Sequence, residues 1–318
     1  SEEMLNAVVD YYADRYNTVI KADEITAVRG TQEGMAHLGM AILNPGDVVL
    51  LPDPGYPVFE AGSYLGGAEV YYYPLLRENN FLPVIEDIPE DVLNKTKYIV
   101  LSYPSNPVGA SAPKEMYVRM IEYAKKYNFA IINDNAYSDI IFDGREGFSF
   151  LSLPGAKDVG VEFFSLSKSY NVTGLRISFC IGNKSIIDAF KLLRSQYDFG
   201  MSYPAQKAAI AALRGPRDSV KAQCAEYQRR RDALLNGLRK YGWNVPDSHG
   251  TMFVWLPVPE GYTSASFTEA LMDKAGVIGT PGTAFGPLGE GYIRFALTKS
   301  AEELAVIADV IGQSGVLS

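Results

Sequence analysis

The chain contains 318 residues, of which 47% are hydrophobic and 21% are charged, with 29 Gly and 18 Pro. This composition is typical of a globular protein, and the length is sufficient for one large core and a second, smaller domain. The formal net charge of -8, with no run of Lys or Arg to offset it, argues against a nucleic-acid-binding surface, so we expect no nucleic acid partner.

The cysteine and histidine content is low. Cys180 and Cys224 do not form a disulfide framework, and with only His37 and His249 beside them the sequence predicts no Cys/His metal cluster. Residues 1–4 are acidic and lack a signal-peptide core, and no apolar run approaches the length needed to span a membrane. We therefore expect a protein of the reducing cytoplasm without a metal or a membrane partner.

Hydrophobic spacing predicts that helices and strands alternate along the first two thirds of the chain. Helices are expected over 5–16, 30–43 and 113–127. Short apolar runs predict strands over 25–28, 48–51, 68–73, 98–102, 130–133, 161–164 and 177–181. This alternation predicts an α/β fold in which a mostly parallel sheet is covered by helices on both faces.

The last third of the chain has a different pattern. Helices are predicted over 184–199, 205–213, 217–241 and 266–274 and from about residue 301, with strands over 252–256 and 292–297. This mixture indicates a smaller α+β domain. We place the boundary near Gly215, which divides the chain into a large domain over 1–215 and a small C-terminal domain over 216–318.

The segment 161–176 combines residues suited to chemistry on a phosphorylated aldehyde. A buried strand leads into small polar residues that carry Lys168, and Arg176 follows eight positions later. The lysine amine can form an imine, while Ser165 and Arg176 can hold a phosphate dianion. Because most lysines are simply solvated, this segment alone does not decide between a site and a surface loop.

Further polar residues follow neighbouring strands of the predicted sheet. Asn106, Asp134 and Lys168 each come after a strand, and residues 30–32 lie where a strand meets a helix N-terminus that favours phosphate. Each has a structural alternative: Asp134 as a helix N-cap, Asn106 as part of a turn, Gly30 as a hinge. Ligands of open α/β sheets bind outside the carboxyl ends of the strands, so their coincidence at one edge favours a binding site.

Several segments together resemble the class I/II pyridoxal-5'-phosphate aminotransferases of the aspartate aminotransferase fold (fold type I). The segments occur in the family's order and are 44–47, 54–57, 102–110, 134–137, 165–176 and 292–295. Within the family, 30–38 and 252–261 are most similar to the branch that holds LL-diaminopimelate, alanine and aspartate aminotransferases. The resemblance implies a three-layer α/β/α large domain, a smaller α+β domain and pyridoxal 5'-phosphate as the cofactor.

The resemblance also implies roles for the residues that would surround the cofactor ring. Lys168 would form the Schiff base and move the proton at the substrate Cα. Asp134 would pair with the pyridine nitrogen and keep it protonated, so that the ring accepts electrons. Asn106 and Tyr137 would hydrogen-bond the phenolic oxygen of the ring, and Tyr56 would stack on its face.

The remaining roles concern the phosphate and the substrate. The phosphate would be bound by Thr31, Gln32, Ser165 and Arg176. Arg294, with Asn106 beside it, would take the substrate α-carboxylate as a bidentate pair that a lysine could not reproduce.

Two features depart from the family pattern. Members usually begin before the helix at 5–16, with a segment that supplies a glycine region at the substrate and a tyrosine that reaches across the dimer, and nothing here matches it. Either the protein lacks this segment, which would leave a gap over the site, or it precedes the residues numbered here. Val108 stands where the family often has threonine, and we expect little consequence because only the backbone turn needs to be preserved.

The sequence thus leads to the hypothesis of an aminotransferase. It would move an amino group between an amino acid of the LL-diaminopimelate, aspartate or alanine type and a 2-oxo acid such as 2-oxoglutarate. A carbon–sulfur lyase on the same scaffold and a non-catalytic cofactor-binding regulator are the alternatives, although Arg294 argues against the regulator because a sensor of cofactor alone needs no carboxylate clamp. From the resemblance we also expect a homodimer.

Overall fold

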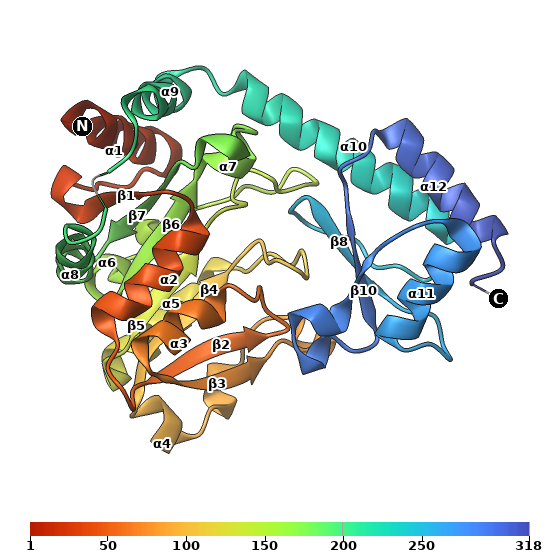
Figure 1. Cartoon of the computed structure of the whole chain (residues 1–318), viewed down its shortest axis with the longest axis horizontal. Coiled ribbons are helices and arrows are strands. Elements are labelled where there is room, and N and C mark those ends of the chain that lie inside the picture. The colour runs from red at the N-terminus through yellow and green to blue at the C-terminus, as the bar shows by residue number, and fades with distance from the viewer. Residues whose placement is uncertain (199, 318) are drawn as a thin grey trace.

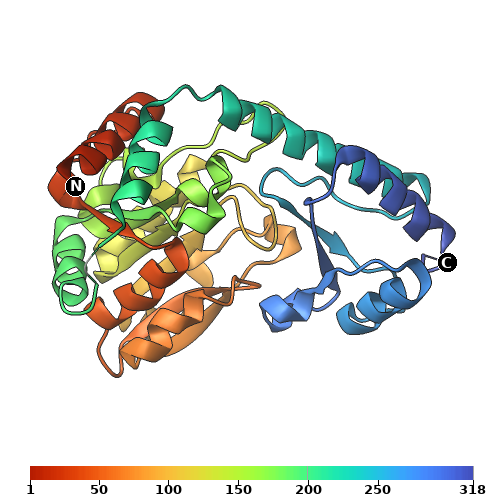
Figure 2. The same cartoon turned by 45° about the horizontal axis from the view of Figure 1, so that its top comes forward.

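The computed structural model describes residues 1–198 and 200–317. These residues form two bodies, a larger one around a seven-stranded sheet and a smaller one around a three-stranded sheet (Figure 1). The long helix α10 (Asp218–Lys240) runs along the top of the molecule from one body to the other (Figure 2). Among the described residues, no helix combines the length and the apolar character needed to cross a lipid bilayer.

The seven-stranded sheet has the strand order β1-β7-β6-β5-β4-β2-β3. Its strands are β1 (Ile25–Val28), β2 (Val48–Asp53), β3 (Glu69–Pro74), β4 (Thr96–Ser102), β5 (Ala130–Asp134), β6 (Gly160–Ser165) and β7 (Ser178–Gly182). The strands from β6 to β3 are parallel to one another, whereas β7 is antiparallel to both of its neighbours. The prediction of a mostly parallel sheet is therefore confirmed.

The directions of the strands bring distant parts of the chain to one edge of this sheet. Because β1 is antiparallel to β7, and β7 is antiparallel to β6, β1 runs in the same direction as β6. The ends of β1, β4, β5 and β6 and the start of β7 therefore share an edge. Residues that follow β1, β4, β5 or β6, and residues that precede β7, therefore meet at this edge.

Helices cover both faces of the large sheet. One face packs against α1 (Glu2–Tyr16), α5 (Lys114–Tyr127) and α9 (Tyr203–Arg214). The other packs against α2 (Thr31–Ile42), α3 (Phe59–Gly66) and α8 (Lys184–Arg194). Successive strand residues alternate between these two cores, as Ile131 and Ile132 do, because side chains of a strand point to opposite faces in turn. The predicted three-layer α/β/α arrangement is confirmed.

Three single-turn helices lie in the loops of the larger body: α4 (Glu90–Leu93), α6 (Ala156–Val159) and α7 (Leu166–Ser169). They are too short to show helical periodicity in the sequence, so they were not predicted. The helix α7 matters for the site, because it follows β6 directly and carries Lys168.

The smaller body is built on an antiparallel sheet. Its strands are β8 (Phe253–Pro257), β9 (Thr280–Pro281) and β10 (Tyr292–Ala296), in the order β8-β10-β9. The helices that pack with it are α11 (Ser264–Ala275), α12 (Ala301–Gln313) and the C-terminal half of α10. Leu234, Leu238, Phe267 and Ile311 lie in its core, which is separate from the cores of the large sheet.

Local signals account for several helix ends. At the start of α12 the Ser300 N–H donates to the Glu303 carboxylate at 2.9 Å and the Glu303 N–H donates to the Ser300 hydroxyl at 3.2 Å, a reciprocal capping box. One predicted helix is wrong in length, because α8 ends at Arg194 and not near residue 199. The Asp198 carboxylate forms an ion pair with Arg194, and the backbone N–H of Asp198 donates to the Arg194 carbonyl, so the chain forms a turn here. Residue 199 lies outside the described residues.

Candidate active site

A cavity of about 310 Å³ lies between the two bodies, at the edge of the large sheet where the sequence predicts that the polar residues meet. All ten residues to which the sequence assigned a site role line it: Thr31, Gln32, Tyr56, Asn106, Asp134, Tyr137, Ser165, Lys168, Arg176 and Arg294. Nine of them belong to the larger body, and Arg294 is carried by β10 of the smaller sheet.

Asp134 is the last residue of β5 and is buried. Burial raises the pKa of its carboxyl to about 7, although the Ala136 N–H and the Lys168 amine favour the charged form. Its Oδ1 atom has no hydrogen-bond partner among the described residues. A buried carboxylate oxygen ordinarily has a donor, and the protonated nitrogen of a pyridine ring would supply one. This residue therefore fits the expected cofactor.

Lys168 lies on α7, directly after β6, and its side chain is partly buried. Burial lowers the pKa of the amine, and the positive charge of Arg176 lowers it further, while the Asp134 carboxylate acts in the opposite direction. A lower pKa increases the share of neutral amine, the form that attacks an aldehyde.

Arg176 and Gly30 are packed against each other and provide an anion cradle. A Cβ atom on Gly30 would lie 2.0 Å from Nη2 of Arg176, and Gly30 has a φ of +107°, so this position needs glycine. The helix α2 begins at the next residue, where its first N–H groups have no partner inside the helix. A guanidinium beside a helix N-terminus suits a phosphate dianion.

The hydroxyl of Ser165 is oriented by two neighbours. Its Oγ accepts a hydrogen bond from the Ser167 N–H at 3.2 Å and another from the Ser178 hydroxyl at 2.9 Å. Since both bonds use Ser165 as an acceptor, its own proton remains to be donated into the cavity. This is the direction that an anion requires.

Arg294 is held between two aromatic rings. Its guanidinium carbon lies 4.1 Å from the ring centre of Phe253 and 4.5 Å from that of Phe285. Its Nη1 donates to Oδ1 of Asn106 at 2.8 Å, and its buried Nε has no partner among the described residues. Burial lowers the pKa of the group. A partly unpaired guanidinium in such surroundings is suited to bind a carboxylate.

Three further predicted residues, Tyr137, Gln32 and Tyr56, also line the cavity. Burial, followed by the charge of Asp134, raises the pKa of Tyr137, so its phenol stays protonated and can donate. The Gln32 amide donates to the Tyr56 hydroxyl. Because the Gln32 side chain is directed to Tyr56, its backbone N–H is the group left for a phosphate.

The sequence assigned no role to several residues that also form the site. Ser167 and Thr173 line the cavity, and the Thr173 hydroxyl donates to the Ser167 carbonyl at 3.2 Å. Phe253 and Phe285 flank Arg294. Phe253 could have been found from the pairing of β8 with β10. In this pairing Arg294 lies opposite Trp255, and Phe253 is two residues from Trp255 on the same strand. The register of the pairing cannot be predicted from the sequence of either strand alone.

The described part of the chain offers few groups for other kinds of site chemistry. Cys180 and Cys224 are free thiols. Within residues 1–198 and 200–317, no three His, Cys, Asp or Glu side chains are grouped so as to hold a metal ion. What one cavity brings together is an amine, a buried carboxylate, an anion cradle and a carboxylate-binding arginine.

Comparison with known proteins agrees with this arrangement. The family model for aminotransferase class I and II matches residues 1–311. The LL-diaminopimelate aminotransferase of Dehalococcoides mccartyi (strain ATCC BAA-2266) is 48% identical over 299 residues, which cover 94% of this chain and 77% of that protein. The enzyme of the same name from Halothermothrix orenii is 42% identical over 303 residues, covering 95% of this chain and 78% of that protein.

Solved structures agree as well. The substrate-bound BacF structure from Bacillus subtilis superposes with a TM-score of 0.96 at 34% identity, covering 99% of this chain and 81% of that one. The chain therefore belongs to the class I and II aminotransferases, the pyridoxal-phosphate-dependent enzymes of fold type I that move an amino group between an amino acid and a 2-oxo acid.

Proposed function

We propose that this enzyme transfers an amino group from LL-diaminopimelate to a 2-oxo acid such as 2-oxoglutarate, using the ten cavity residues in the roles that the resemblance implies. The observation that carries the assignment of roles is the buried Oδ1 of Asp134, which no described residue hydrogen-bonds, in one cavity with the Lys168 amine and Arg294. The name shared by relatives at 42–48% identity supports the substrate.

Each residue has a chemical task in this proposal. When bound, pyridoxal phosphate supplies an electron sink for the electron pair left when the substrate Cα loses its proton. Lys168 accepts that proton at Nζ, and its lowered pKa keeps the amine free to do so. Asp134 holds a proton on the ring nitrogen through Oδ1. Arg294 orients the substrate by its carboxylate, while Asn106 and Tyr137 donate hydrogen bonds to the phenolic oxygen.

The phosphate group has its own set of partners in the proposal. The N–H groups at the start of α2 (Thr31 and Gln32), the Ser165 hydroxyl and the Arg176 guanidinium bind its oxygens. Tyr56 packs on the face of the ring. These contacts anchor the cofactor independently of the covalent link at Lys168.

A half-reaction screen tests the substrate. The cofactor-loaded enzyme is mixed with LL-diaminopimelate, aspartate, glutamate or alanine, and the loss of the aldehyde absorbance is followed for each donor. We expect LL-diaminopimelate to have the highest kcat/KM, and a higher value for any of the other three would overturn the assignment. A carbon–sulfur lyase would instead release ammonia and retain the aldehyde absorbance.

The proposal includes an organisation for the protein. Residues 1–215 and 216–318 form the large and small domains, the enzyme works in the cytoplasm, and two copies associate as a homodimer. Sedimentation of the cofactor-loaded protein tests the association, with a mass of twice that of the chain as the expected result.

A further inference from the structure

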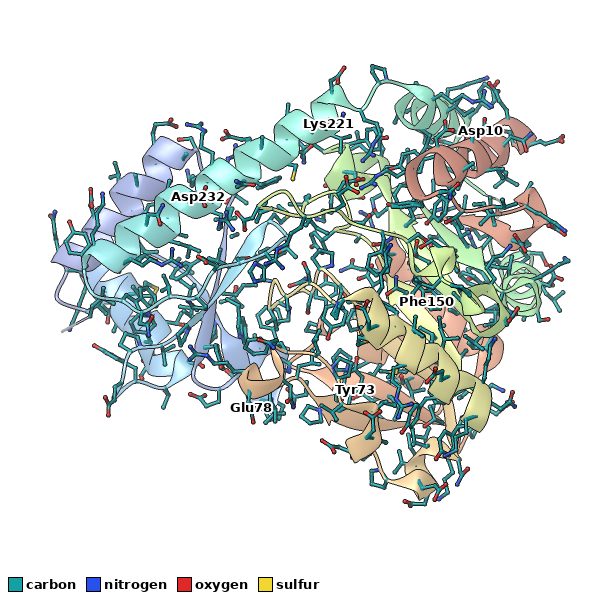
Figure 3. The ribbon with its side chains drawn as sticks, turned by 180° about the vertical axis from the view of Figure 1, so that it is seen from behind. Asp10, Tyr73, Glu78, Phe150, Lys221 and Asp232 are labelled. Carbon is teal, nitrogen blue, oxygen red and sulfur yellow. The ribbon has the colours of Figure 1, made fainter. Side chains whose placement is uncertain are left out.

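The helix α10 makes side-chain contacts with both bodies of the molecule. At its N-terminal end the N-cap residue Arg217 pairs with the buried Asp139, and in its N-terminal half the Cys224 thiol lies 3.2 Å from the Ile141 carbonyl oxygen. In its C-terminal half Leu234 and Leu238 lie in the core of the smaller body. Figure 3 labels Lys221 on the part of α10 that lies toward the large sheet and Asp232 on the part that lies toward the smaller one.

In the same N-terminal half, α10 also contacts the backbone of the lysine in the site. The Gln223 side-chain amide, through Nε2, donates to the Lys168 carbonyl oxygen at 2.8 Å, and the bond is partly buried. The two residues are 55 positions apart in the chain. Gln223 is therefore a contact to Lys168 from a helix whose C-terminal half packs in the core of the smaller body.

This contact gives a partner to one of the last carbonyls of a very short helix. The last carbonyls of a helix have no partner inside it, and α7 has a single turn. The Leu166 carbonyl accepts from the Tyr170 N–H at 3.0 Å, and the Ser167 carbonyl accepts from the Thr173 hydroxyl at 3.2 Å. Both of these donors belong to the loop itself, whereas the donor to the Lys168 carbonyl is Gln223 of α10.

We propose that Gln223 is a positioning residue, which ties the backbone of Lys168 to α10 and so couples the orientation of the amine to the placement of the smaller body. An isolated helical turn is not stable by itself, so its orientation depends on contacts from outside. A small misplacement of a reacting group has a large effect on rate, and the smaller body also carries Arg294, which faces the same cavity. The proposal rests on the role proposed above for Lys168.

The test compares two glutamines of the same helix. Gln223→Met removes the amide donor and keeps the length of the side chain and its helix propensity. Gln228→Met is the matched control. Gln228 accepts a hydrogen bond at 3.0 Å from the Asp143 N–H, so it also joins α10 to the backbone of the larger body. This bond does not involve Lys168. Gln223→Glu is the second variant, which keeps the length and loses the donor, should Gln223→Met not fold.

The first measurement is amide hydrogen exchange on the cofactor-free proteins. Loss of one hydrogen bond should accelerate exchange over residues 166–172 by about threefold to tenfold in Gln223→Met. In Gln228→Met those residues should exchange at the wild-type rate, and the Asp143 region should exchange faster. The second measurement is the half-reaction of the loaded enzymes, in which Gln223→Met should lower kcat by about threefold to tenfold with KM unchanged, since the binding groups are intact.

Two results would overturn the proposal. One is wild-type exchange over residues 166–172 in Gln223→Met, and the other is a kcat equal to that of Gln228→Met. Lys168→Ala tests the proposed function separately. Retained turnover in Lys168→Ala would overturn the role of Lys168 and this proposal with it, whereas lost turnover there, combined with wild-type behaviour of Gln223→Met, would overturn this proposal alone.

Discussion

The Arg294 guanidinium and the Asn106 carboxamide are joined by a hydrogen bond in which Nη1 donates to Oδ1 over 2.8 Å, although the two residues belong to different bodies of the molecule. Asn106 lies in the loop after β4, and Arg294 lies on β10. The bond fixes one edge of the guanidinium beside the cavity. The flanking rings of Phe253 and Phe285 restrict its remaining motion, so the group is oriented before a substrate arrives.

Arg294→Lys should therefore weaken donor binding more than it slows turnover. A lysine presents a point charge and cannot both bind Asn106 and form two parallel bonds with a carboxylate. We expect KM for the amino donor to rise about 10- to 100-fold, the factor that corresponds to the free energy of a charge-assisted hydrogen bond, and kcat to change less. Arg239→Lys is the control, because Arg239 donates to the Val245 carbonyl within the smaller body. An unchanged KM in Arg294→Lys would contradict the assignment of this residue.

Asp134→Asn should abolish most of the activity while the protein still folds. The amide has nearly the same shape, but it does not hold a proton on a ring nitrogen. We expect kcat to fall about 10²- to 10⁴-fold, the range for a positioned acid–base group. Steady-state turnover and cofactor content are measured together, because full occupancy with low turnover separates a catalytic effect from lost binding.

The same residue should make the stability of the cofactor-free protein depend on pH. Burial raises the pKa of Asp134 from 3.8 to about 7, so between these values the folded protein holds a proton that the unfolded chain releases. Wild-type stability should therefore fall, relative to Asp134→Asn, as the pH rises from about 4 to about 7, by about 4 kcal/mol in total, and then level off. Urea unfolding of both proteins across this pH range measures the difference. If the wild type instead became more stable relative to Asp134→Asn as the pH rises, burial would not be destabilising the charged form of this carboxyl.

Gly30→Ala should weaken cofactor binding. Its new methyl group would meet the Arg176 guanidinium at 2.0 Å and displace it from the phosphate cradle. We expect the Kd for pyridoxal phosphate to rise at least about tenfold, the effect of losing one charge-assisted contact. Gly144→Ala is a matched control, since Gly144 also has a positive φ but no atom of residues 1–198 or 200–317 lies within 4 Å of the added Cβ. It should lose stability but keep its affinity for the cofactor.

Glu162 should be a major contributor to stability. Its fully buried carboxylate accepts hydrogen bonds from Tyr12 at 2.8 Å, Ser149 at 2.8 Å, the Phe150 N–H at 2.8 Å and Asn133 at 3.0 Å. Glu162→Leu would leave these donors unpaired in the core. We expect the free energy of unfolding to fall by about 3–5 kcal/mol.

The control for this variant is Glu69→Leu. Glu69 lies on β3 of the same sheet but is exposed. Its replacement should change the free energy of unfolding by no more than about 0.5 kcal/mol. Equal effects of the two substitutions in urea unfolding would contradict the importance of the buried network.

The sequence by itself determined the main strands of the fold and the family to which the chain belongs. The predicted strands of both sheets lie within two residues of the observed ones, because hydrophobic period and turn residues are local properties of the chain. All ten predicted site residues line one cavity: nine meet at the edge of the large sheet where its parallel strands end, and Arg294 reaches the cavity from β10. The motif at 165–176 also identified the family, which the comparisons confirm.

Only the tertiary structure decided how these residues act on one another. The contact of Arg294 with Asn106 and that of Gln223 with Lys168 join positions 188 and 55 residues apart in the chain, so neither can be derived from local sequence. The raised pKa of Asp134 and the lowered pKa of Lys168 likewise follow from burial, which is a property of the whole packed chain. Short-range preferences place a residue on a strand or in a loop, but its partners and its surroundings are set by long-range packing.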